Sequence, residues 1–207
     1  MNSVEQNIRT RLDALPAQLA PLAEMTMKYS RYCSAVDTDD TLLVGHMPWT
    51  APQAYAFRLY PGAKKAWFER YSQAPIECQI PASFRQVLSA VNGLFAFGLS
   101  LDGIPPSRLS DAHSLDRSKL QCFDLATANQ NWKREYRGAP EGFHFGGRHY
   151  SASENAGYFL TGKSRIASVL KDGRIVGEWV EFDAFMRDEL RAAEEFETAK
   201  IEPGWWR

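Results

Sequence analysis

One segment of the chain matches, letter for letter, a pattern that binds phosphate. Residues 157–164, Gly-Tyr-Phe-Leu-Thr-Gly-Lys-Ser, satisfy GxxxxGK followed by Ser or Thr, in which the backbone N–H groups of a flexible loop wrap a phosphate. That loop needs a buried strand before it and a helix after it. Here Tyr-Phe-Leu-Thr is bulky and strand-forming, and an Ile- and Val-containing run leads on to Asp172-Gly173. We therefore predict a strand whose side chains alternate between core and solvent, and keep a nucleotide-binding enzyme as an alternative.

Two further groups contain residue types that metal binding or catalysis uses. His144 and His149 are five positions apart, and an odd separation places side chains on opposite faces of a strand. A shared metal would require Gly146-Gly147 to break that strand. The segment from Gly98 to Asp102 resembles a nucleophile elbow around Ser100, but it has Asp where the sharp turn needs a second glycine. We expect no metal site, no cofactor and no catalytic residue.

The composition excludes several classes of protein. The 207 residues include 24 Lys and Arg and 25 Asp and Glu, so a net charge of -1 gives no basic field for nucleic acid. No apolar run approaches the ~20 residues that a bilayer span requires, and the first residues are too polar for a signal peptide. Cys33, Cys78 and Cys122 are too scattered for a disulfide framework or a CxxC metal site. We expect a cytoplasmic protein that binds neither nucleic acid nor membrane.

The charged residues are distributed unevenly along the chain. Residues 178–197 contain eight acidic and two basic residues, whereas residues 131–174 contain eight basic and four acidic ones. A solvated helix face explains such a split, and a surface that steers a basic partner is the alternative. The long polar loop 103–119 is a second candidate for recognition. The candidate partner-binding residues are acidic or aromatic: Asp102, Asp111, Asp116, Glu178, Glu181, Trp205 and Trp206.

Hydrophobic periodicity predicts an α+β fold with a central, mostly antiparallel sheet flanked by helices. The clearest helix begins near Pro81 and has Phe84, Leu88 and Val91 on one face, with Asn92-Gly93 at its left-handed end. Asp172-Gly173 predicts a hairpin, and Asp183 is a suitable N-cap for the closing helix. The predicted helices are 4–15, 19–33, 63–74, 81–91, 126–136 and 183–196; the predicted strands are 42–44, 95–101, 120–125, 143–145, 158–160, 166–170 and 175–180.

The segment Ile80-Pro-Ala-Ser-Phe84-Arg-Gln-Val-Leu88-Ser-Ala-Val-Asn92-Gly93 resembles the hallmark of the SUKH superfamily, a proline-led helix that ends in Asn-Gly and precedes a strand. Later features resemble the family in the same order, from Phe123-Asp-Leu125 to the closing helix at Phe182. The likeness covers about residues 60–196. It implies an α+β domain, which we place at 60–207. Residues 1–59 lie outside the likeness, and their periodicity predicts a helical N-terminal extension packed on that domain.

Members of that superfamily bind protein partners: many are immunity proteins that neutralise polymorphic toxins, and others regulate the fungal cell wall. The resemblance implies no catalytic residues. It therefore favours a non-enzymatic, immunity-type protein that binds a cognate protein toxin. A nucleotide-binding enzyme that uses residues 157–164 and a generic interaction scaffold remain the alternatives.

Overall fold

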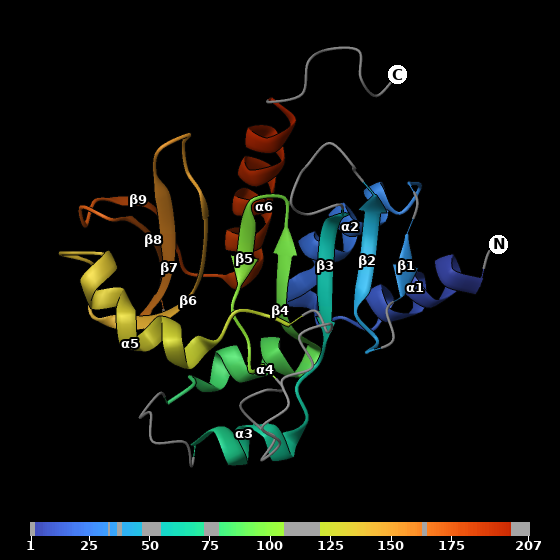
Figure 1. Ribbon diagram of the computed structural model, residues 1–207, viewed down its shortest axis with the longest axis horizontal. Helices are drawn as coiled ribbons and strands as arrows, with labels where there is room; N and C mark the ends of the chain where they lie inside the picture. The colour runs from blue at the N-terminus through green and yellow to red at the C-terminus, as the bar shows by residue number, and fades with distance from the viewer. Residues whose placement is uncertain are drawn as a thin grey trace.

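A computed structural model describes residues 3–32, 34–36, 39–46, 55–72, 79–105, 121–162 and 165–199. Within these ranges nine strands form one sheet, and each strand pairs antiparallel with its neighbours in sequence (Figure 1). The predicted α+β fold with an antiparallel sheet is confirmed. The strands are β1 Ala35–Val36, β2 Leu42–His46, β3 Tyr55–Pro61, β4 Val91–Ala96, β5 Leu99–Leu101, β6 Gly142–His149, β7 Asn155–Thr161, β8 Ile166–Leu170 and β9 Ile175–Trp179.

The N-terminal part of the chain forms two helices and then contributes strands β1, β2 and β3 to this sheet. Helix α1 (Ser3–Asp13) and helix α2 (Ala20–Tyr29) are joined by a short 3-10 turn, and Pro21 lies in the first turn of α2, where its missing N–H costs nothing. Strands β1, β2 and β3 follow and pair in series with β4. The boundary expected between residues 59 and 60 falls inside β3, so the first 59 residues supply strands as well as helices.

One face of the sheet carries the main hydrophobic core. It packs against α1, α2, α4 (Ala82–Ala90) and α6 (Phe182–Thr198), while α3 (Lys65–Ser72) lies beyond one end of the sheet (Figure 1). Phe84 and Leu88 of α4 and Phe185 of α6 are fully buried, and Val91 follows at the start of β4. These four residues are in the core, as their spacing predicts. Helix α6 begins at Phe182 with Glu181 as its N-cap, close to the predicted start at Asp183.

The junction between α4 and β4 differs from its prediction. Helix α4 ends at Ala90, and Val91 already has an extended backbone. Asn92 and Gly93 therefore lie inside β4 instead of ending the helix. Gly93 does have a left-handed φ of 87°, and a Cβ there would also lie 2.6 Å from the Cβ of Cys122. Glycine is therefore needed at position 93 for its positive φ and for the close approach of two segments, and not to end a helix.

The opposite face of the sheet is covered over β6–β8 by α5 (Leu125–Glu135). Asp124 caps this helix by accepting a hydrogen bond from the N–H of Ala126. Trp132 of α5 packs edge-to-face on Phe159 of β7, with ring centroids 5.2 Å apart. Because helices cover both faces at this point, Tyr158 and Phe159 are both fully buried. The predicted alternation between core and solvent is wrong for β7, although the strand itself is confirmed.

The connection between β8 and β9 and the segment before α5 were also predicted from the sequence. Asp172-Gly173 joins β8 to β9 as predicted, with Gly173 at a φ of 89°. The strand predicted at 120–125 is wrong over its described part: an isolated bridge pairs Asp124 with Gly103, and α5 begins at Leu125. None of the helices in the described ranges combines the length and the apolar character that crossing a membrane demands.

Candidate functional site

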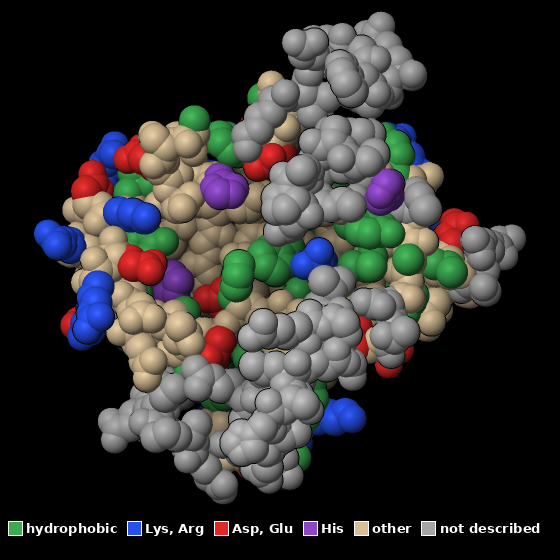
Figure 2. Space-filling model, viewed as in Figure 1, with side chains coloured by type: hydrophobic (Ala, Val, Ile, Leu, Met, Phe, Trp, Pro, Cys, Tyr) green, Lys and Arg blue, Asp and Glu red, His purple; other side chains and the backbone are tan. Residues whose placement is uncertain are grey.

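A cleft of about 760 Å³ lies on the face of the sheet that α5 covers in part. Its walls come from β3–β5 on one side and from β6, β7 and α5 on the other, and the end of α6 contributes Glu197. Figure 2 shows the hollow on this face, with acidic and histidine side chains around it. The cleft has the size of a typical ligand pocket.

Aromatic side chains line much of the cleft. Phe123 is 57% exposed and packs edge-to-face on Phe95, with ring centroids 4.9 Å apart. An exposed aromatic ring beside a pocket is a common feature of binding sites, because it offers a large rigid contact area. The aromatic lining comprises Tyr55, Phe95, Phe97, Phe123 and Tyr136.

The charged lining is mainly acidic. Among the described residues, four acidic side chains, those of Asp102, Asp124, Glu135 and Glu197, and one guanidinium, that of Arg148, line the cleft. That guanidinium is already paired, because its Nε lies 2.5 Å from Glu189, a buried residue of α6 that also accepts a hydrogen bond from Tyr158. Within the described ranges, the lining of the cleft therefore carries more acidic than basic side chains, which favours a cationic ligand.

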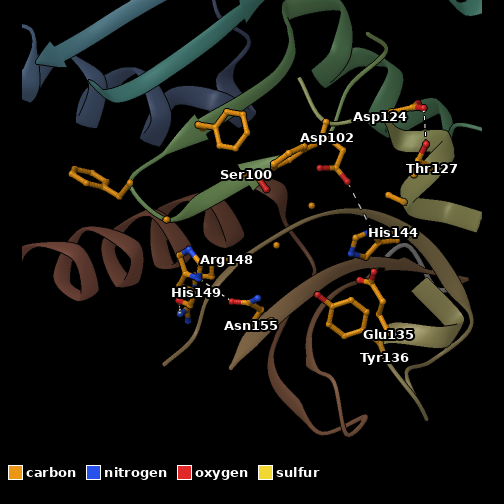
Figure 3. A pocket seen from close by; sticks show the side chains of 18 of the residues that line it. Ser100, Asp102, Asp124, Thr127, Glu135, Tyr136, His144, Arg148, His149 and Asn155 are labelled. Carbon is orange, nitrogen blue, oxygen red and sulfur yellow. Dashed lines mark hydrogen bonds and ion pairs between the residues drawn. The ribbon is translucent and has the colours of Figure 1, made fainter. Parts of the chain in front are cut away.

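The most buried polar groups of the cleft are Asp102 and His144. Asp102 is 4% exposed and His144 is 9% exposed. Figure 3 shows the two side chains pointing toward one another, and Oδ2 of Asp102 lies 3.9 Å from Nδ1 of His144. Burial, with a contribution from Asp124, raises the pKa of Asp102 to about 7. Burial lowers the pKa of His144 to about 4, so at neutral pH the imidazole is neutral and the carboxyl is partly protonated.

Hydrogen bonds fix the backbone of His144, whereas its ring makes none among the described residues. The side chain of Asn129 accepts a hydrogen bond from the N–H of His144 at 2.9 Å and donates one to its carbonyl at 2.7 Å. Neither ring nitrogen has a hydrogen-bond partner among the described residues. Gly157 gives the ring its space, because a Cβ there would lie 2.6 Å from Tyr136 and 3.0 Å from Nε2 of His144. Buried polar atoms are almost always hydrogen-bonded, so two unpartnered nitrogens on a residue that lines the cleft require an explanation.

Asp102 is positioned by a second asparagine. The amide of Asn92 in β4 donates to the carbonyl of Ile104 and accepts from its N–H, both at 2.8 Å. Gly103 fits between them, since a Cβ there would lie 2.5 Å from the carbonyl oxygen of Asn92. The segment that follows β5 is thus fixed, and the backbone N–H of Asp102 bonds to the carbonyl of Phe145 in β6.

The two histidines of β6 share the cleft, contrary to the expectation from their spacing. The register of β6 against β7 shifts between His144 and Gly146, and such a bulge changes which face later side chains point to. His149 lines the cleft as His144 does, and its Nδ1 lies 2.9 Å from Oδ1 of Asn155. Among the described residues no three His, Cys, Asp or Glu side chains form a group that fits a metal ion.

Ser100 lines the same cleft as Asp102 and His144, the three side-chain types of a hydrolytic triad. A triad requires the serine hydroxyl to hydrogen-bond to the imidazole. Both nitrogens of His144 lack hydrogen-bond partners within the described ranges, so the triad contacts are not made. Ser100 lies in the middle of strand β5 and not on a sharp strand-to-helix turn, which agrees with rejecting a nucleophile elbow there.

The phosphate-loop match does not have the required surroundings. Gly157–Thr161 lies within strand β7, hydrogen-bonded between β6 and β8. Strand β8 begins at Ile166, where the motif requires a helix. Lys163 and Ser164 lie outside the described residues.

Of the candidate partner-binding residues, the three that the structure describes do not lie together. Asp102 is buried in the cleft and is not a surface carboxylate. Glu178 and Glu181 are exposed near the end of β9 and the start of α6, and neither lines the cleft. The others, Asp111, Asp116, Trp205 and Trp206, lie outside the described residues.

Several of the acidic side chains in the segment 178–197 are compensated by basic partners, which the composition of the segment does not show. Four of its carboxylates have basic partners: Glu189 pairs with Arg148, Glu194 with Lys28 of α2, Asp183 with Arg187, and Asp188 with Arg191. Much of the negative charge of α6 is therefore compensated within the fold.

Sequence reasoning missed the importance of His144 and the burial of Asp102. One signal was present: Asn92-Gly93 and Gly146-Gly147 mark places where the backbone is irregular or closely packed. Comparisons with protein families, curated proteins and solved structures found no match to this chain. The SUKH likeness therefore stays a resemblance of motifs.

Proposed function

We propose that this chain is a non-enzymatic, immunity-type binding protein, which neutralises a basic protein toxin by holding a segment of that toxin in the cleft. One observation supports this above all: the cleft combines four carboxylates with five aromatic side chains. Carboxylates attract Lys and Arg directly, and aromatic faces attract the same cations through their quadrupoles. A volume of about 760 Å³ suits a few residues of a bound segment.

Individual residues of the cleft have different roles in recognition. Glu135 is exposed on α5 at the rim of the cleft, where it pairs directly with a Lys or Arg of the bound segment. Phe123 gives an aromatic anchor at the surface, the kind of residue that dominates binding energy. The resemblance to immunity proteins independently favours a protein partner, and we propose that the chain acts in the cytoplasm.

The cleft is also a poor site for a nucleotide, although the nucleotide-binding alternative itself concerns residues 157–164, whose described part does not line the cleft. A nucleotide carries several negative charges, and bringing it into a cleft lined by Asp102, Asp124, Glu135 and Glu197 is electrostatically unfavourable. The guanidinium of Arg148 is paired with Glu189, so it does not offset this repulsion.

The test is protection of cells from a toxin. The polypeptide encoded by the reading frame adjacent to this gene is produced in bacteria with and without the protein, and survival is counted. We expect this polypeptide to be toxic alone and harmless together with the protein. The purified pair should form a stoichiometric complex. A harmless neighbour, or toxicity that the protein does not relieve, would show the proposal to be wrong.

Matched variants locate the binding surface. Combining Glu135→Lys with Phe123→Ala should weaken binding at least tenfold and reduce protection. Glu24→Lys on α2 is the control, because Glu24 is exposed and does not line the cleft. If the cleft variant protects as well as the control while remaining folded, the toxin does not bind in the cleft.

A further inference from the structure

We infer that Asp102 and His144 form a subsite for a single arginine guanidinium. The inference rests on the proposed function only for the source of that arginine, a basic segment of the partner. A guanidinium is planar and offers five N–H donors in a fixed fork. Asp102 offers two carboxylate oxygens, and the neutral ring of His144 offers one accepting nitrogen. The two residues project from opposite walls toward the same space (Figure 3).

The carboxylate of Asp102 needs a partner that the fold does not supply. It is 96% buried, since 4% is exposed, and a buried carboxylate is costly unless it is paired. Among the described residues, neither a cation nor a hydrogen-bond donor compensates it, and the nearest ring nitrogen is 3.9 Å away. A guanidinium placed against it gives the two parallel hydrogen bonds that carboxylates form best.

His144 is the second, independent sign of a ligand. Its residue surface is about nine-tenths buried, it lines the cleft, and both ring nitrogens lack hydrogen-bond partners in the described part of the chain. Because the imidazole is neutral at pH 7, it does not repel a cation. One nitrogen carries a proton and the other accepts, so the ring complements a donor-only group such as guanidinium.

The groups that face Asp102 from the surrounding elements are compatible with a cation. They are Asp124 at the N-terminus of α5, Cys122 just before it, Tyr136 near the end of α5 and His144 on β6. Burial raises the pKa of Cys122 and of Tyr136 to about 12 in each case, so both are uncharged at pH 7. The ring of Tyr136 also lines the cleft, with its centroid 5.6 Å from that of His144.

The guanidinium of the cleft itself does not reach this subsite. Figure 3 shows Arg148 and His149 at the end of the cleft away from Asp102 and Asp124. Arg148 is held there by its ion pair with Glu189 of α6.

Binding of the guanidinium is linked to release of a proton. The carboxyl of Asp102, with a pKa of about 7, is mostly protonated at pH 6 and mostly ionised at pH 8. Only the ionised form pairs with a cation, so the proton goes to solvent as the guanidinium binds. Apparent affinity scales with the ionised fraction, which predicts binding about tenfold tighter at pH 8 than at pH 6.

The experiment uses small probes and does not need the toxin. N-acetyl-arginine methylamide is titrated into the full chain at pH 6, 7 and 8, with amide chemical shifts as the readout. The control probe is N-acetyl-citrulline methylamide, which has nearly the same shape but no charge. We expect saturable arginine binding that tightens with pH, and citrulline binding at least tenfold weaker. Binding of a lysine probe as tight as that of arginine would overturn the guanidinium assignment.

Two variants complete the test. Asp102→Asn mimics the protonated carboxyl and should lose arginine binding, and His144→Gln should weaken it several-fold. Asp183→Asn is the control, since that carboxylate lies on α6 and does not line the cleft. If a variant fails to fold, the pH series and the citrulline comparison on the unmodified protein decide the question.

Besides equal binding of the lysine probe, three results overturn the inference: no saturable binding, equal binding of the arginine and citrulline probes, or affinity that is constant or falls as the pH rises. A protein that binds the arginine probe but gives no protection leaves the subsite intact and refutes the proposed function. Protection without arginine binding refutes the subsite alone.

Discussion

The side-chain amide of Asn129 hydrogen-bonds to both backbone polar groups of His144, accepting at 2.9 Å and donating at 2.7 Å. This contact occurs where β6 has lost its neighbour, because β5 ends at Leu101, opposite Gly146. The amide of Asn129 thus makes the two backbone hydrogen bonds that a neighbouring strand would otherwise make with His144. Asn92 does the same for Ile104, so one asparagine on each wall fixes the backbone beside the Asp102–His144 pair.

Replacing Asn129 should therefore cost stability and ligand binding together. Asn129→Ala leaves the backbone N–H and carbonyl of His144 without their partners, and we expect a loss of about 1 to 3 kcal/mol in the free energy of unfolding. Urea unfolding measures this loss. Gln130→Ala, at the next and exposed position of α5, is the control and should change stability by less than about 0.5 kcal/mol. Equal effects of the two substitutions would refute the role of Asn129.

The local elements were predictable because they depend on nearby residues. The i, i+3, i+4 spacing of Phe84, Val87 and Leu88 places one helical face in the core, and all three are buried. Asp172-Gly173 needs only its own backbone preferences to form the hairpin. The phosphate-loop match was rejected on its immediate surroundings, and strand β7 agrees with that interpretation.

The site was not predictable because it depends on contacts between distant residues. The bulge between His144 and Gly146 reverses the side-chain parity that a regular strand has. Asn92 bonds to Ile104, twelve residues away, which no local pattern shows. Asp102 looks like a surface residue in sequence because it follows a strand, and it becomes buried only where the walls of the cleft meet.

The Asp102–His144 pair should give opposite pH dependences of stability when each residue is removed. The pKa of Asp102 is raised from 3.8 to about 7, so the folded state retains a proton that the unfolded chain loses above pH 4. Stability from this group is present at low pH and falls toward pH 7. The pKa of His144 is lowered from 6.5 to about 4; the unfolded chain binds the extra proton, and stability rises from pH 4 to 6.5.

In the unmodified protein these two slopes, each at most about 1.4 kcal/mol per pH unit, offset one another between pH 4 and 6.5. Asp102→Asn should leave a stability that increases with pH over this window, and His144→Gln one that decreases. Urea midpoints at pH 4.5 and 6.5 measure the signs. Slopes of the same sign in both variants would contradict the assignment of these pKa values.

Leu88 should be essential for the core that supports the cleft. Its side chain is fully buried, and Leu88→Ala should cost about 2 to 5 kcal/mol through lost burial and a cavity. Thermal or urea unfolding measures this cost. Gln86→Ala, on the exposed face of α4, is the control for the same helix. A Leu88→Ala protein as stable as that control would mean that α4 is wrongly placed.

Nucleotides should not bind at residues 157–164. The backbone N–H and carbonyl groups of Gly157–Thr161 belong to a strand that pairs on both sides, so they cannot wrap a phosphate as the motif requires. Isothermal titration with ATP and GTP in the presence of magnesium should give no measurable heat of binding. A micromolar dissociation constant that disappears in Lys163→Ala would support the enzyme alternative instead.

The exposed carboxylates Glu178 and Glu181 should affect how fast the toxin associates, not how tightly it is held. They lie outside the cleft, and charges outside the contact act mainly by steering the encounter. Replacing both by Lys should slow association a few-fold at low salt, with the difference lost above about 0.5 M salt because screening shortens the range of the field. Stopped-flow mixing measures both rate constants. Glu135→Lys, in the cleft, should instead speed dissociation. If the Glu178 and Glu181 double variant loses protection while Glu135→Lys keeps it, the toxin binds at the start of α6 and not in the cleft.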